Sequence, residues 1–352
     1  MTSTIEKIAT TYLESGSVNW QVCIELHNKL IVDNPSLAKA CLKRSIELKP
    51  ILVKRLNLKD DELRLIAERH SIVVLDHAAY KLGRYFKVPT INSRETLDLE
   101  IFQILSTETS RFPIKKIQKS EKVFGFGSCF ALNFINYLHK LDIDAHSSII
   151  SEDINCPINN LLLLKWIFKN EESSLINDLK EFNPDIDRLD LLNKFKDANH
   201  IVLTLGASFF LIKNQEKMEI TLKPSSNTKY TFQNINSLKQ SITQIIELIK
   251  SVNNKVNIII SVSPIPLRAT LDGRDPVSAN VASKSALRAA IEELMIENKL
   301  SFTYLPIYDA VIGLSPYMGF ASFGTDDGES RHLNGEITNS IMRQMTDLII
   351  EA

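Results

Sequence analysis

The sequence predicts a three-layer α/β fold, with a parallel sheet between layers of helices, preceded by a helical domain. From residue 119 onward, short apolar runs alternate with longer segments of helical periodicity. Continuously apolar strands that alternate with helices are typical of a parallel sheet buried on both faces. The N-terminal part shows helical patterns alone. We therefore expect a helical domain over residues 1–83, a connecting segment over 84–118 and the α/β domain over 119–352.

Two helices are expected in the N-terminal domain. Residues 20–30 place apolar side chains at the spacing of one helical face, and a second helix is expected over 37–48, after the break at Pro35. Residues 38–50 resemble the second helix of a tetratricopeptide repeat, although nothing recurs at that repeat's period of about 34 residues. The hairpin is therefore either a cap or oligomerisation element, which would suit a homodimer, or a docking platform for a protein partner.

In the α/β domain, strands and helices are expected to alternate. The strands are the apolar runs at residues 123–127, 145–150, 200–205, 256–262 and 302–305. The helices occupy about residues 130–140, 157–169, 237–250, 280–298 and 335–350. Residues 209–232 are expected to insert a small hairpin beside the carboxyl ends of the strands.

Charge and hydropathy exclude several classes of protein. With 41 basic and 42 acidic residues the formal net charge is -1, and the basic residues are scattered, unlike the clustered basic surface of nucleic-acid-binding proteins. No run approaches the roughly 20 apolar residues of a transmembrane helix, and the N-terminus lacks the apolar core of a signal peptide. We expect no nucleic-acid partner and no membrane span.

The cysteines favour a reducing compartment. The chain has four cysteines and no Cys-x-x-Cys spacing, which argues against a disulfide framework in a chain of this length. Cys23 and Cys41 lie on helical patterns and are expected in the core. A cytoplasmic location fits best. The chain also lacks a Gly-rich phosphate loop and zinc-ligand spacing, so neither a metal nor a nucleotide cofactor is expected.

The segment Gly127-Ser128-Cys129-Phe130-Ala131 carries the strongest chemical signal. It follows the first strand of the α/β domain and turns into a helix, at the edge of a parallel sheet where ligands bind. Two nucleophilic side chains, Ser128 and Cys129, lie beside the N–H groups of a helix start, which can stabilise the oxyanion of an acyl transfer. In the alternative interpretation, Ser128 only caps the helix.

This pentapeptide is the signature of the GSCFA family, which is similar to the SGNH (GDSL-type) hydrolases and acyltransferases. The resemblance continues, in the family's order, at residues 203–208, 261–270 and 282–288 and in the acidic segment that ends at Arg331-His332. It covers roughly residues 111–335. The resemblance implies an SGNH-like, flavodoxin-like sheet and an acyl-handling enzyme.

The resemblance also assigns catalytic roles. The SGNH pattern Gly-Asp-Ser places its nucleophile at Cys129, whose thiol is more nucleophilic than a hydroxyl, and Ser128 stays the alternative. His332 stands where the family has its general base. The carboxylate that orients the imidazole is Glu329 or Asp327, and the sequence leaves that choice open.

The segments that carry the resemblance also contain candidates for oxyanion and substrate contacts. Gly206 corresponds to the glycine donor, Ser208 stands where asparagine would, and Asn159 or its neighbour Asn160 is a further donor or else a helix cap. Three cations are candidates for substrate binding: Arg268, Lys284 and Arg288. In the alternative interpretation, Arg268 holds the loop that contains Pro264 and Pro266, and either Lys284 or Arg288 is solvated.

Two functions are therefore carried forward. The first is an esterase or O-acyltransferase that works through an acyl-enzyme on a glycan precursor, a metabolite or a protein-bound substrate. The second is a binding or scaffold protein on a degenerate SGNH fold, because the aspartate of the first block and the asparagine of the third are missing.

Overall fold

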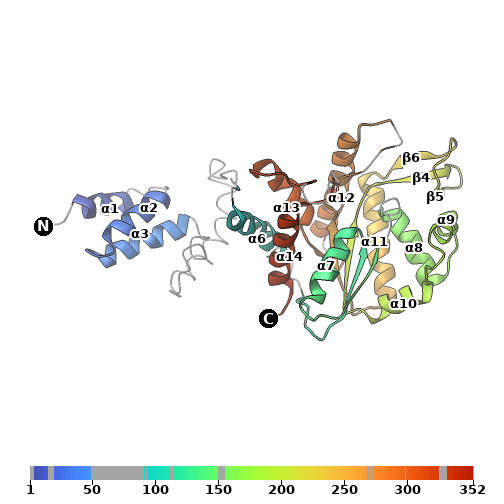
Figure 1. Cartoon of the computed structure of the whole chain (residues 1–352), viewed down its shortest axis with the longest axis horizontal. Coiled ribbons are helices and arrows are strands. Elements are labelled where there is room, and N and C mark those ends of the chain that lie inside the picture. Colours follow the sequence, from blue (N-terminus) through green and yellow to red (C-terminus); the bar gives the residue numbers. More distant parts are fainter. Residues whose placement is uncertain are drawn as a thin grey trace. The chain divides into compact units, whose positions relative to one another are not determined.

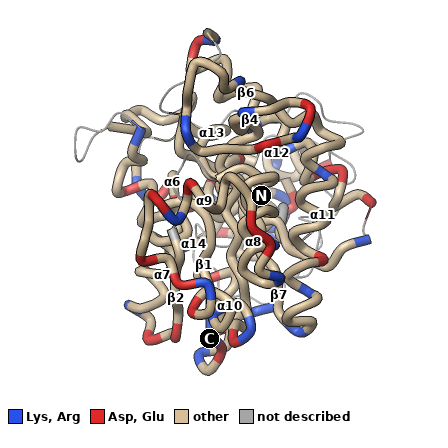
Figure 2. The backbone as a smooth tube through the Cα atoms, turned by 90° about the vertical axis from the view of Figure 1, so that its right-hand side faces the viewer, with Lys and Arg blue, Asp and Glu red and all other residues tan. Residues whose placement is uncertain are grey.

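The computed structural model describes residues 4–14, 20–48, 91, 93–110, 115–149, 155–267, 270, 273–297, 299–324 and 331–351. These residues fall into two compact units, one within residues 1–88 and one within 89–352 (Figure 1). None of the described helices has the length and apolarity needed to cross a bilayer. Figure 2 shows acidic and basic residues interspersed along the described chain.

The N-terminal unit is helical, as predicted. It contains α1 (Thr4–Glu14), α2 (Trp20–Leu30) and α3 (Pro35–Leu48). A small core joins the three helices, formed by Ala9, Leu26, Leu30, Ala38 and Cys41. Cys23 and Cys41 are both fully buried, as expected. The likeness to a tetratricopeptide repeat stays a prediction.

The second unit is built on a five-stranded parallel sheet of order β2-β1-β3-β7-β8. In chain order, its strands are β1 (Val123–Gly127), β2 (Ala145–Ile149), β3 (His200–Leu205), β7 (Asn257–Val262) and β8 (Thr303–Tyr304). If these strands are renumbered from 1 to 5 in chain order, the sheet order becomes 2-1-3-4-5, which is the flavodoxin-like order. The prediction of an α/β sheet with residues 123–127 as an interior strand is confirmed.

Successive side chains of each strand point to opposite faces of the sheet, so the sheet divides the core into two halves. Phe124 and Phe126 of β1 belong to one apolar cluster, whereas Val123 belongs to the other. Five helices cover the first face: α8 (Pro157–Lys169), α9 (Ser174–Phe182), α10 (Arg188–Asp197), α11 (Ile235–Val252) and α12 (Pro276–Glu297). Four helices cover the second: α6 (Arg94–Ser110), α7 (Cys129–His139), α13 (Ile307–Leu314) and α14 (Gly335–Ile349) (Figure 1).

Helix α6 lies within the segment expected to be a connection. Its apolar side chains Leu97, Ile101 and Leu105 are buried in the second core half. Its Asp98 accepts hydrogen bonds from Ser340 and Arg343 of α14. The compact α/β unit therefore includes this helix and starts at Pro89, ahead of the residue 119 expected from the sequence.

The predicted hairpin is a three-stranded antiparallel sheet. It consists of β4 (Phe209–Asn214), β5 (Glu219–Thr221) and β6 (Lys229–Phe232), in the order β5-β4-β6. The N–H of Gln233 donates to the carbonyl of Ser208 at 2.7 Å, so the two ends of the insertion meet. The insertion thus leaves the main sheet at the carboxyl end of β3 and returns beside it (Figures 1 and 2).

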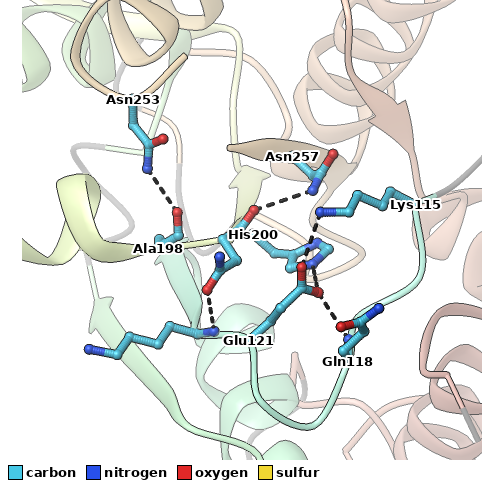
Figure 3. Close-up of polar contacts among 9 residues, drawn as sticks. Lys115, Gln118, Glu121, Ala198, His200, Asn253 and Asn257 are labelled. Atoms are coloured by element: carbon cyan, nitrogen blue, oxygen red, sulfur yellow. Dashed lines mark hydrogen bonds and ion pairs between the residues drawn. The ribbon is translucent and has the colours of Figure 1, made fainter. Parts of the chain in front are cut away.

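A cluster of polar side chains lies at the opposite, amino end of β3, where His200 is buried and Glu121 is half-buried (Figure 3). The ring Nε2 of His200 is 2.7 Å from Oε2 of Glu121, and Lys115 and the N–H of Gln118 bond the same carboxylate at 3.0 Å each. Burial raises the pKa of Glu121, but these donors outweigh it and lower the pKa to about 2. Burial lowers the pKa of His200, and the hydrogen bond to Glu121 opposes this effect without cancelling it.

Candidate active site

The carboxyl end of β1 is shaped by a glycine. Gly127 has a φ of +126°, a conformation that other residues rarely adopt. A Cβ at this position would lie 2.3 Å from the carbonyl oxygen of Thr204. Glycine therefore lets β1 approach β3 closely before the chain turns into α7.

Ser128 is the N-cap of α7. Its Oγ accepts a hydrogen bond from the N–H of Phe130 at 3.2 Å and another from the hydroxyl of Thr204 at 2.9 Å. The same Thr204 oxygen accepts from the N–H of Ser128 at 2.6 Å. The capping role considered for Ser128 is thus present, and two donors hold its oxygen.

Cys129 is the first residue of α7, and it is the exposed cysteine of the four. Cys23, Cys41 and Cys156 are buried. Burial raises the pKa of Cys156 to about 12 and also raises the pKa values of Cys23 and Cys41. Solvent access and a helix start therefore coincide at one thiol, Cys129.

The expected oxyanion donor Gly206 is occupied. Its N–H donates to the carbonyl of Asn155 at 3.0 Å, and the N–H of Ala207 donates to the same oxygen at 2.9 Å. A Cβ on Gly206 would lie 2.8 Å from that oxygen, so the glycine serves a close backbone approach. The β3–β4 connection is thus bonded to the loop before α8, and the expected role of Gly206 as an oxyanion donor stays a prediction.

Several buried polar atoms near this connection lack hydrogen-bond partners. They are both side-chain atoms Nδ2 and Oδ1 of Asn159, Oδ1 of Asn160 and Oγ of Ser208. The N-cap of α8 is Cys156, so neither asparagine caps the helix. Asn160 donates from Nδ2 to Oδ1 of Asn155 at 3.2 Å, which links it to the residue that holds Gly206. Buried polar groups are normally paired, so these four atoms are exceptions among the described residues.

Lys284 on α12 is buried, with 1% of its surface exposed. Its Nζ donates to the carbonyl of Gly206, and the hydroxyl of Ser283 accepts from the N–H of Ser208 at 2.8 Å. The start of α12 therefore fixes the β3–β4 connection from the other side. Lys284 is not solvated, since its ammonium group bonds the backbone of Gly206.

Arg288 has a structural role. It donates to Asp309 on α13 at 2.8 Å and to Glu292 at 2.6 Å, and it stacks 4.6 Å from the ring centroid of Tyr304. Burial lowers its pKa, but the interactions with Asp309, Tyr304 and Glu292 outweigh burial and raise it. Acidic partners hold its guanidinium between α12 and α13, and the expected substrate contact of Arg288 stays a prediction.

His332 is exposed and lies on the segment before α14. Its carbonyl accepts from the N–H of Gly324 at 2.9 Å. The next residue, Leu333, packs against the core half that contains Phe130, the residue after Cys129. The segments that carry the expected base and nucleophile therefore lie on the same side of the main sheet. Three other predicted residues, Arg268, Asp327 and Glu329, lie outside the described residues.

Residues 179–344 of this chain match the GSCFA family model. The match includes Gly206, Lys284 and His332, and it confirms the expected family resemblance for these residues. It starts after Ala131, so the signature pentapeptide lies outside the matched GSCFA region. No match was found among curated proteins.

Solved structures similar to this chain include several esterases and one acetyltransferase. A putative GDSL-like lipase from Parabacteroides merdae is 12% identical, with 67% of this chain and 100% of that chain covered and a TM-score of 0.37. A carbohydrate esterase family 3 structure from Talaromyces cellulolyticus is 13% identical, covering 64% and 95%, with a TM-score of 0.33. The lipopolysaccharide acetyltransferase periplasmic domain of Salmonella ser. Paratyphi A is 12% identical, covering 76% and 99%, with a TM-score of 0.34.

Sequence reasoning missed two residues that build the site. Thr204, within the GSCFA region, holds Ser128, and Asn155 holds Gly206 and Ala207. The signal for Thr204 is a hydroxyl inside an otherwise apolar strand, Leu203-Thr204-Leu205. Asn155 carries no comparable signal, because its carbonyl, a group that every residue has, makes the contacts with Gly206 and Ala207.

Proposed function

We propose that this protein is an acyl-handling enzyme, an esterase or O-acyltransferase, that forms a covalent acyl-enzyme on Cys129. The observation that carries the proposal is the exposed thiol at the first position of α7, next to a serine whose oxygen is held as the cap. Cys129 is therefore preferred over Ser128 as the nucleophile. A helix N-terminus also favours the thiolate over the thiol.

In the first half-reaction, His332 takes the proton of the Cys129 thiol and the thiolate attacks the carbonyl carbon of an ester. The tetrahedral oxyanion collapses, the carbon–oxygen bond to the leaving group breaks, and imidazolium returns the proton to the departing alkoxide. In the second half-reaction, His332 deprotonates water or an acceptor hydroxyl, which attacks the thioester. The thiolate leaves and regains the proton.

The oxyanion is stabilised by the positive end of α7 and by the side-chain amide of Asn159. The Gly206 N–H is engaged by Asn155, whereas the Asn159 amide is buried and has no hydrogen-bond partner. An amide donor of this kind contributes about 10²- to 10³-fold to acyl transfer. Asp327 or Glu329 orients His332, and Arg268 contacts the substrate. The acceptor is a glycan precursor, a metabolite or a protein-bound group in the cytoplasm.

Intact-mass spectrometry with p-nitrophenyl acetate tests this function. The wild-type chain should gain one acetyl group, and Cys129→Ala and His332→Ala should not. Ser128→Ala should still be labelled. Cys41→Ala is the matched control, because Cys41 is a buried thiol. An adduct that survives Cys129→Ala and disappears with Ser128→Ala would transfer the nucleophile's role to Ser128.

The alternative function is a binding or scaffold protein on a degenerate SGNH fold. One observation favours it: the N–H of Gly206, expected to bind the oxyanion, is used internally. This alternative predicts neither an acyl adduct nor ester turnover with any activated ester.

A further inference from the structure

The inserted sheet carries a row of three aromatic side chains, Phe209, Tyr230 and Phe232. The ring of Phe209 lies 5.2 Å from that of Tyr230 and 5.3 Å from that of Phe232, measured between centroids. The opposite face of β4 supplies Phe210 and Ile212 to the core. All three rings are half-buried, and Phe209 also packs against the core.

The Tyr230 end of this row borders a hollow of about 320 Å³. Its described lining consists of Leu211, Pro224, Ser225, Thr228 and Tyr230. Leu211 and Tyr230 are directly paired across β4 and β6. The N–H of Ser225 donates to Oγ1 of Thr228 at 2.8 Å, and that hydroxyl donates back to the Ser225 carbonyl at 2.8 Å. A closed turn therefore holds one wall of the hollow in place.

The chemistry of the lining selects a class of ligand. None of the five described lining residues carries a charge, so an ionic group would have no counter-charge there. The aromatic face of Tyr230 attracts C–H groups of positive partial charge, and the nearby hydroxyls of Ser225 and Thr228 can bond polar groups at the ligand's edge. A pyranose ring combines an apolar C–H face with hydroxyls around its rim. The hollow is in the size range of small-molecule sites.

Chain continuity and a hydrogen bond join the inserted sheet to the β3–β4 connection. Phe209 directly follows Ser208, whose carbonyl is bonded to Gln233 at the other end of the insertion. The guanidinium of Arg274 lies 3.6 Å from the ring centroid of Phe232, at the far end of the aromatic row. Arg331, the neighbour of His332, donates to the carbonyl of Pro266, which lies shortly after β7, at 3.1 Å.

We infer that this hollow is a subsite for an uncharged pyranose ring of the substrate, with Tyr230 as its stacking platform. The inference rests on the proposed function, since it names the class of compound that carries or accepts the acyl group. It assigns substrate selection to the inserted sheet and bond chemistry to the ends of β1 and β3.

Calorimetric titration of the full chain with neutral cello-, xylo-, manno- and N-acetylchito-oligosaccharides tests the subsite. At least one series should bind, and Tyr230→Ala should weaken it about tenfold or more. Tyr230→Phe, which keeps the ring, should stay within about threefold. Leu211→Trp, which fills the hollow, should abolish binding. Phe182→Ala is the matched control, because Phe182 is an exposed aromatic residue on α9.

The outcomes separate this inference from the proposed function. Acetylation of Cys129 without any oligosaccharide binding would overturn the subsite and leave the acyl chemistry standing. Oligosaccharide binding without an acetyl adduct would support the subsite and overturn the enzyme. Oligosaccharide binding that is unchanged in both Tyr230→Ala and Leu211→Trp would overturn the pyranose assignment. Binding of decanoate, an acyl chain, in place of every oligosaccharide tested would overturn it as well.

Discussion

The hydroxyl of Thr204 bonds both the N–H and the Oγ of Ser128, at 2.6 and 2.9 Å. One side chain of β3 thereby fixes the residue that caps α7 and directly precedes Cys129. The geometry at the exposed thiol depends on a neighbouring strand as well as on its own helix.

Replacing Thr204 by valine should loosen this link. Valine has a similar shape but neither donates nor accepts, so the Ser128 N–H loses its partner, at a cost of about 1–3 kcal/mol in the free energy of unfolding. Urea denaturation measures this change, and ester turnover should fall at least tenfold. Thr204→Ser keeps the hydroxyl and should retain most of the stability and most of the ester turnover. Equal losses in the two variants would contradict the role of the hydroxyl.

Iodoacetamide should modify Cys129 before the other cysteines. The thiolate is the reacting form, and Cys129 is exposed at a helix start, whereas burial raises the pKa of Cys156 to about 12. Peptide mass mapping at pH 7 over a time course gives the order of labelling. Early labelling of Cys23 or Cys41 in the folded protein would contradict the burial of these two residues.

The Asn159→Leu variant should separate stability from activity. Leucine removes a buried amide that has no hydrogen-bond partner, so the free energy of unfolding should stay the same or rise by about 1–3 kcal/mol. Ester turnover should fall by about 10²-fold, because the oxyanion loses its amide donor. A stabilised variant with full turnover would exclude Asn159 from the reaction.

Arg288→Ala should lower the free energy of unfolding by about 1–3 kcal/mol, because Asp309 and Glu292 lose a charged donor. Arg288→Lys should recover less than half of this loss, since one ammonium cannot reproduce the fork of the guanidinium. Thermal and urea unfolding measure the effect. A rise in KM without any loss of stability would restore the substrate-binding role.

Stability should fall as the pH decreases, in two steps. Burial lowers the pKa of His200, so below pH 6.5 the unfolded chain binds a proton that the folded chain does not. Glu121 has a folded pKa of about 2 against an ordinary 4.5, so its contribution is present above pH 4.5 and is lost as the pH falls toward 2. In Glu121→Gln the second step, on the order of 2–3 kcal/mol, should disappear from the unfolding curves.

Much of the fold followed from the sequence because the apolar runs are strong signals. The run at residues 200–205 became β3 with the expected bounds, and residues 157–169 became α8. Helix α10 was not expected: it begins at Arg188 and buries only Leu191 and Phe195, so its short amphipathic pattern resembles a loop.

The site was less predictable, because its contacts depend on the backbone. The sequence identified Gly206, but not that the carbonyl of Asn155 would occupy its N–H. The same holds for Lys284, whose i, i+4 spacing with Arg288 gave no sign that one ammonium would lie buried against a carbonyl. Such contacts join segments far apart in the chain and leave no local pattern.

The 2.7 Å hydrogen bond between Gln233 and Ser208 closes the inserted sheet at its base. The entropic cost of closing a loop rises by only about 0.6 kcal/mol for each doubling of the loop's length. Inserts of other sizes could therefore join the same two points. A replacement would need apolar side chains where Phe210 and Ile212 now complete the core. During divergence, residues 209–232 could therefore be exchanged as a unit, which would alter the compounds accepted while the strand leading to Cys129 stayed the same.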